Sequence, residues 1–240
     1  MIYPEFIKEK QTVGICAPSA GVGSKIEAFE ESIQVLEQMG YRVKETASVR
    51  RDAPRSTGQR KRAKELDELV LDPDVRLILA AAGGDYMLEM MPYVRFDHIR
   101  ENPKWLCGVS DPTNLLFTVT TGCDIATIYG RNGAGFVFQA KRPQKDFLKI
   151  VQGDFIPQHS YVKTCRHEVR WIAKEKIDTE GRLIGGCVEV IAKLIGTRFD
   201  HTSKFLERYR DDGIIWYFDI FNMSSYNFYL TLLQFKNAGW

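Results

Sequence analysis

Along the first half of the chain, short apolar segments alternate with segments of helical periodicity, and this order constrains the fold more than any other feature. The strand-like segments are residues 12–17, 41–45, 75–82, 105–109 and 124–129, and the helix-like segments are residues 25–39, 60–71, 86–91 and 112–121. Strands that alternate with helices over short turns are typical of a parallel sheet covered by helices on both faces. We therefore predict an α/β protein.

The functional groups of such a sheet gather in the turns at the carboxyl ends of its strands. Four turns hold that position here: PSAG at residues 18–21, AAGGD at 81–85, GVSDP at 108–112 and IYGRNG at 128–133. We expect the candidate site residues in these turns.

Ser110 lies where the predicted strand 105–109 runs directly into the predicted helix 112–121. A serine at such a bend is exposed at the top of the sheet, and the first free N–H groups of the helix point at whatever it attacks. The N–H of Asp111 would then stabilise an oxyanion. A plain N-cap is the alternative, because Ser-Asp-Pro before a helix is also a capping pattern.

Gly83 and Gly84 follow a buried strand, so their amides can face a ligand, and Asp85 ends this turn as a candidate substrate-binding residue. A tight turn that requires positive φ is the alternative reading of the two glycines. Because none of the glycine turns matches a dinucleotide or triphosphate loop, we predict no nucleotide cofactor.

Asp219 stands inside the apolar run IIWYFDIF at residues 214–221. A carboxylate among such neighbours is costly unless it is paired, so Asp219 either orients an imidazole or an amine, or ends the strand and faces water. The histidines lie in no motif; they are His98, His159, His167 and His201. The sequence thus offers a serine and an acid without an evident general base.

The net charge of +2 gives no reason to expect nucleic acid or a membrane surface as partner. The one basic run is interpreted as a solvated loop and the polar face of a helix; it comprises Arg50, Arg51, Arg55, Arg60, Lys61, Arg62 and Lys64. No signal peptide is evident, and no apolar run approaches the roughly 20 residues of a membrane span. The five cysteines form no CxxC pair, so we expect buried reduced thiols, no metal site and a cytoplasmic location.

The pattern changes after residue 137. Residues 138–180 are rich in charge and lack alternation, which indicates a linker or covering segment. A second compact unit follows, with a glycine turn and helix at 181–197, a strand at 213–221 and a helix at 227–238. The expected division is therefore 1–137, 138–180 and 181–240.

A set of motifs in this order resembles the LD-carboxypeptidase family of serine peptidases, which includes the peptidases that confer immunity to microcin C. The motifs are GICAPSAG, AAGGD, NPKWLCGVSDPTNL, TIYG, GRLIGGCVEVIAKLIGT, DGIIWYFD and FKNAGW. The resemblance implies a flavodoxin-like N-terminal domain that carries the nucleophile, and a smaller α/β C-terminal domain that carries a glutamate and a histidine. It places the nucleophile at Ser110, the oxyanion donors at Asp111 and at Gly83 or Gly84, and the family glutamate at Asp219.

The chain departs from the family at two points. Asp219 is one methylene shorter than the glutamate, and the family's histidine lies beyond the motif that ends here as NAGW, so a C-terminally truncated member is expected. The resemblance implies a homodimer that acts on small peptides with a terminal carboxylate, as in cell-wall peptide recycling, or on a microcin-like peptide-nucleotide. Trp171, in the segment that resembles the covering loop of the microcin branch, either stacks on the substrate or anchors the loop.

Three hypotheses follow. The chain is a serine carboxypeptidase, an inactive member that at most binds a ligand, or a flavodoxin-like binding domain in which Ser110 only caps a helix.

Overall fold

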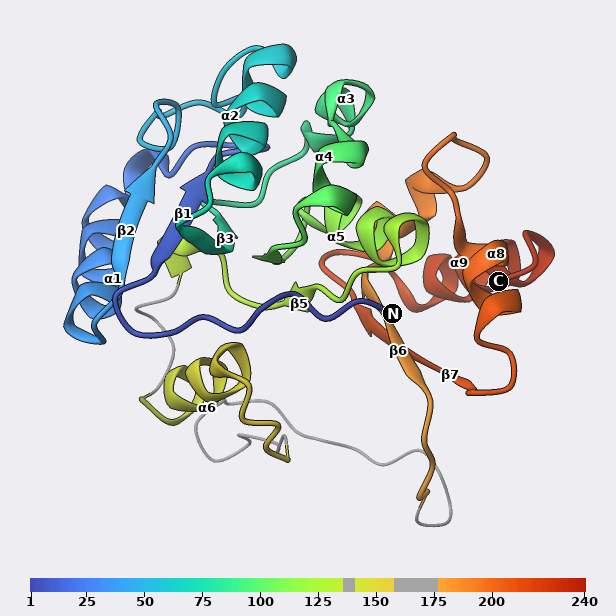
Figure 1. The fold of residues 1–240 in the computed structure, drawn as a ribbon. Coiled ribbons are helices and arrows are strands. Elements are labelled where there is room, and N and C mark those ends of the chain that lie inside the picture. Colours follow the sequence, from blue (N-terminus) through green and yellow to red (C-terminus); the bar gives the residue numbers. More distant parts are fainter. Residues whose placement is uncertain (136–140, 158–176) are drawn as a thin grey trace.

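The computed structural model describes residues 1–135, 141–157 and 177–240, and a five-stranded parallel sheet forms within its first 130 residues (Figure 1). The strands are β1 (Thr12–Cys16), β2 (Arg42–Glu45), β3 (Val75–Ala80), β4 (Trp105–Gly108) and β5 (Ile128–Tyr129). Their order in the sheet is β2-β1-β3-β4-β5, the order of flavodoxin-like sheets. The predicted α/β fold is confirmed.

Helices cover both faces of this sheet, and successive side chains of β3 enter opposite cores because strand side chains alternate between faces. Leu77 and Leu79 pack in the cluster that contains the apolar side of α1 (Ile26–Gln38). Ile78 packs in the other cluster, together with the apolar side of α2 (Gln59–Leu71). Burial on both faces leaves the turns at the strand ends as the place for polar groups.

The remaining helices of this half are shorter. They are α3 (Met87–Met90), α4 (Phe96–Glu101), α5 (Thr113–Thr118) and α6 (Lys141–Gln152), with 3-10 turns at Gly23–Lys25, Met91–Tyr93 and Gly133–Gly135. A π-helical turn at Val119–Cys123 continues α5. Helix α5 follows the Ser110 turn directly, so the packing of α5 determines where that turn lies.

A second, two-stranded parallel sheet pairs β6 (Arg182–Cys187) with β7 (Ile214–Asp219). Its helices are α7 (Val188–Ile191), α8 (Thr202–Arg208) and α9 (Ser225–Asn237), with a 3-10 turn at Ala192–Leu194. Trp216 of β7 stacks on Trp240 and on Phe117 of α5, with ring centroids 6.0 and 6.2 Å apart. These aromatic contacts hold the C-terminal unit against the helix that follows Ser110.

The structure differs from the sequence-based expectations at three places. Residues 182–187, expected as a glycine turn, form β6, and a Cβ at Gly185 would lie 1.8 Å from the carbonyl oxygen of Tyr217. Glycine is therefore required there by the close approach of β7, rather than by a turn. Residues 141–152, within the segment interpreted as a linker, form α6, and the expected strand at 124–129 is reduced to β5.

None of the helices in the described part of the chain is long and apolar enough to cross a membrane. Cys16, Cys107, Cys123 and Cys187 are buried and free, whereas Cys165 lies outside the described residues. Burial raises the pKa of the Cys107 thiol to about 12, so this side chain is a protonated core group at neutral pH.

Candidate active site

Ser110 occupies a strained turn between β4 and α5. Its φ is +69°, in the left-handed region that residues with a Cβ rarely adopt. The carbonyl oxygen of Ser110 accepts hydrogen bonds from the N–H of Thr113 at 2.9 Å and from its hydroxyl at 2.6 Å. The N-cap of α5 is Pro112, and no side chain caps this helix. The alternative reading of Ser110 as a plain N-cap is therefore wrong.

Asn132 fixes the residue before the nucleophile candidate. Its side-chain carbonyl accepts the N–H of Val109 at 2.9 Å, and its side-chain amide donates to the carbonyl of Val109 at 3.2 Å. This bidentate pairing copies the hydrogen bonds of a neighbouring strand. Sequence reasoning placed the turn IYGRNG at the correct edge of the sheet but assigned Asn132 no role.

Gly83 lies directly against the side chain of Ser110. A Cβ at Gly83 would be 3.2 Å from Cβ and 3.3 Å from Oγ of Ser110. Within the described residues, no hydrogen-bond acceptor is recorded for the N–H groups of Gly83, Gly84 or Asp111. Free N–H groups beside a serine hydroxyl are the elements of an oxyanion hole.

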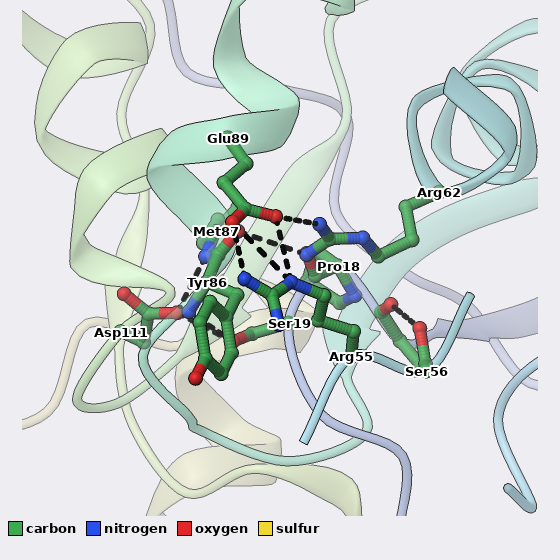
Figure 2. A network of polar contacts seen from close by, with 10 residues as sticks. Pro18, Ser19, Arg55, Ser56, Arg62, Tyr86, Met87, Glu89 and Asp111 are labelled. Carbon is green, nitrogen blue, oxygen red and sulfur yellow. Dashed lines mark hydrogen bonds and ion pairs between the residues drawn. The ribbon is translucent and has the colours of Figure 1, made fainter. Parts of the chain in front are cut away.

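The carboxylate of Asp111 is buried and fully engaged (Figure 2). It accepts hydrogen bonds from the Ser19 hydroxyl at 2.5 Å, from the Met87 N–H at 2.8 Å and from the Asn114 side-chain amide at 2.9 Å. The side chain of Asp111 thus joins the Ser110 turn to two neighbouring loops. The sequence singled out Asp111 for its N–H and gave no indication of this second role.

Asp219 reaches the same end of the molecule from the C-terminal unit. Its exposed carboxylate ends β7 and accepts a hydrogen bond from the Tyr129 hydroxyl at 2.5 Å, and that hydroxyl in turn accepts the N–H of Ser110 at 3.4 Å. Burial, and next the Asp219 carboxylate, raise the pKa of Tyr129 far above its ordinary value, so the phenol stays protonated. Sequence reasoning missed Tyr129, although its register with Gly108 places it beside the nucleophile strand.

Other predicted site residues stand apart from this group or cannot be placed. Asp85 is exposed at the end of the glycine turn, and Trp171 lies outside the described residues. His98 pairs with Asp67 at 2.8 Å, and His201 packs on Gly122. Among the described residues, no contact between Ser110 and a histidine is recorded. His159 and His167 lie outside the described residues.

A cleft of about 900 Å³ opens between β5 and β6. Its walls include Trp105, Tyr129, Arg182 and Tyr217, but Ser110 is not among the lining residues. Tyr129, whose hydroxyl accepts the N–H of Ser110, connects this cleft to the nucleophile candidate.

Comparisons with known proteins show similarities in sequence and in fold. Residues 13–130 match the family model described as the LD-carboxypeptidase N-terminal domain. A Vibrio cholerae protein named as a putative carboxypeptidase is 26% identical over 224 residues, which cover 83% of this chain and 66% of that protein. The microcin C7 self-immunity protein MccF of Escherichia coli is 31% identical over 121 residues, which cover 50% of this chain and 35% of MccF.

Solved structures of similar proteins share the fold. A mutant of MccF in complex with adenosine monophosphate superposes with a TM-score of 0.78 at 20% identity, covering 99% of this chain and 76% of that structure. An MccF-like protein from Bacillus anthracis gives a TM-score of 0.79 at 20% identity, with the same coverage. The sequence alignments thus cover just under two thirds of the Vibrio relative and 35% of MccF, whereas the superposition covers 76% of the MccF mutant structure. Residues 13–130, just under half of the chain, thus match the LD-carboxypeptidase N-terminal domain, and the chain is similar in sequence to a putative carboxypeptidase and to MccF.

Proposed function

We propose that this chain carries the nucleophile and the oxyanion-stabilising groups of a serine-type carboxypeptidase. The observation that carries the proposal is the positive φ of Ser110 at a strand-to-helix turn, with its hydroxyl against Gly83. A serine whose only role was to cap or to pack would have no reason to hold this strained conformation.

The proposed reaction is acyl transfer. The hydroxyl oxygen of Ser110 attacks the carbonyl carbon of an amide, and a base takes the hydroxyl proton. The N–H of Asp111 and an N–H of the Gly83–Gly84 turn stabilise the negative oxygen of the tetrahedral intermediate. The amine then leaves with a proton from the conjugate acid, and water hydrolyses the acyl-enzyme.

Asp219 is proposed to orient the base. Its carboxylate lies one hydroxyl away from the N–H of Ser110, through Tyr129. An imidazole between Ser110 and Asp219 would take over the hydrogen bond that Tyr129 now donates. The residue that supplies this imidazole is not assigned, since His98 and His201 lie elsewhere.

The proposed substrates are small peptides with a free terminal carboxylate, or a peptide-nucleotide. Relatives named as carboxypeptidases support the first class. MccF, solved with glutamyl sulfamoyl guanosine, supports the second. We further propose a cytoplasmic homodimer, as the family resemblance implies; Asp85 and Trp171 remain proposed substrate contacts.

Cleavage is tested by incubating the chain with a cell-wall tetrapeptide and, separately, with an aminoacyl sulfamoyl nucleotide. Mass spectrometry of the products should show loss of the terminal residue from one of them, and Ser110→Ala should abolish this loss. If the wild type and Ser110→Ala leave both compounds intact, the carboxypeptidase proposal fails.

An inactive, ligand-binding family member is the second candidate. It is favoured by the lack of a recorded contact between Ser110 and a histidine in the described residues, and by Asp219 where the family has glutamate. Calorimetric binding of either compound without turnover would select this candidate over the peptidase.

A further inference from the structure

The hydroxyl of Ser19 connects the two segments that carry the proposed oxyanion donors. It donates to the buried carboxylate of Asp111 at 2.5 Å and accepts the N–H of Tyr86 at 3.3 Å. Asp111 follows the nucleophile candidate, and Tyr86 lies two residues after Gly84. Ser19 itself is fully buried in the turn after β1, so water does not compete for either hydrogen bond.

The same turn sets the orientation of the glycine peptide. The N–H of Ala20 donates to the carbonyl oxygen of Gly83 at 3.1 Å. In a trans peptide the N–H points opposite to the carbonyl, so the N–H of Gly84 points away from Ala20. A Cβ at Gly84, where φ is +144°, would lie 2.4 Å from Oγ of Ser19, so Ser19 packs directly on this glycine.

A buried guanidinium holds the turn from behind (Figure 2). Arg62 of α2 donates to the carbonyl oxygens of Pro18 and Tyr86, each at 2.9 Å, and pairs with Glu89 at 3.3 Å. Arg55 also pairs with Glu89, at 2.7 Å, and its hydrogen bonds hold the pKa of that carboxyl below its usual range. The sequence predicted that the whole basic run is solvated, but the side chain of Arg62 is buried.

We propose that Ser19 is a positioning residue for the oxyanion hole: its hydroxyl fixes the distance between the N–H of Asp111 and the N–H of the Gly83–Gly84 turn. Arg62 supports it by tying Pro18 to Tyr86. This inference rests on the proposed acyl-transfer function. Ser19 acts through Asp111 and Tyr86 and has no recorded contact with Ser110 in the described residues.

The test measures how fast a fluorophosphonate labels Ser110, because the phosphonyl oxygen of this probe occupies the oxyanion hole while the serine oxygen displaces fluoride. Ser19→Ala removes the hydroxyl but leaves Asp111 with the Met87 and Asn114 donors, so the fold should persist. Ser48→Ala is the matched control, because the buried Ser48 hydroxyl also donates to a buried carboxylate, that of Glu65.

We expect Ser19→Ala to lower the maximal labelling rate at saturating probe by tenfold or more, with little change in the half-saturating concentration. Ser48→Ala should label like the wild type, although both variants lose a comparable hydrogen bond. A merely structural role for Ser19 would lower the stability of both variants alike and leave the labelling rate of folded protein unchanged.

Three outcomes are distinguishable. Equal rates for Ser19→Ala, Ser48→Ala and the wild type would overturn the positioning role while the proposed function stands. A wild type that is not labelled would overturn the proposed function, and this inference with it. Should Ser19→Ala not fold, Ser19→Cys, which keeps the volume with a weaker donor, should show an intermediate rate; a wild-type rate there would also overturn the role.

Discussion

Ser110 is the residue at which sequence and structure agree most closely, and the reason is local. A strand that ends in glycine and a helix that begins beside proline leave three residues for a sharp bend, and a Cβ at Gly108 would lie 2.7 Å from Cβ of Pro112. The bend was therefore predictable from GVSDP. The positive φ was not, because serine has no intrinsic preference for it and the turn is held by Thr113 and Asn132.

The strain at Ser110 can be measured with two substitutions. Ala keeps the Cβ that disfavours positive φ, whereas Gly does not, although Gly costs more chain entropy on folding. We expect Ser110→Gly to be more stable than Ser110→Ala by about 0.5–1 kcal/mol. Urea unfolding of both variants measures the difference, and a more stable Ala variant would contradict the strained turn.

Tyr129 and Asp219 form a hydrogen-bonded pair, of which the sequence indicated only Asp219. Asp219 was conspicuous as a carboxylate in an apolar run. It lies exposed at the end of β7, which is one of the two alternatives that the sequence left open. Tyr129 was not conspicuous, because a tyrosine in a strand usually contributes to the core. The approach of β7 to β5 gives its hydroxyl an acceptor, the Asp219 carboxylate.

Tyr129→Phe tests this pair through its pH dependence. The pKa of Tyr129 is raised in the folded protein, so the stability that the protonated hydroxyl provides is present below the ordinary phenol pKa and is lost as the pH rises above it. We expect Tyr129→Phe to be less stable than the wild type by about 1 kcal/mol at pH 7. The gap should narrow above pH ~10, as followed by denaturant unfolding; a gap that widens there would contradict the assignment.

At the scale of elements, the parallel sheet was predictable because its strands are apolar on both faces and its helices keep a clear period. The expected segments at 12–17 and 75–82 appear as β1 and β3 with small shifts at their ends. Helix α6 and strand β6 were not predictable in the same way. The first half of α6 is charged, and its apolar residues lie only within 147–151. The glycines of β6 mimic a turn, although Gly185 allows the close approach of β7 and a Cβ at Gly186 would lie 2.5 Å from the Thr113 side chain.

Helix α9 provides a matched test of the packing between the C-terminal unit and the rest of the molecule. Phe235 is buried in the aromatic cluster with Trp216 and Trp240, whereas Leu233 on the same helix is 38% exposed. Phe235→Ala should lower the free energy of unfolding by about 3–5 kcal/mol. Leu233→Ala should change it by less than about 1 kcal/mol; equal losses in thermal or urea unfolding would contradict this packing.

At the scale of the whole molecule, the candidate site combines turns from both units. Ser110, Gly83 and Ser19 follow strands of the large sheet, and Asp219 ends a strand of the small one. Sequence patterns predicted which turns meet, because parallel strands end at one edge. They could not predict the buried connections, since Arg62 stands within a basic run and Ser19 within a glycine turn, and neither pattern distinguishes a buried side chain from a solvated one.

The central claim is that Ser110 is an activated nucleophile, and the most direct measurement is labelling by a serine-reactive fluorophosphonate, read by intact mass. We predict stoichiometric labelling of the wild-type chain that is lost in Ser110→Ala. Far-UV circular dichroism of both samples shows that they are folded. A folded wild type that remains unlabelled, or a Ser110→Ala variant that is labelled to the same extent, would contradict the claim.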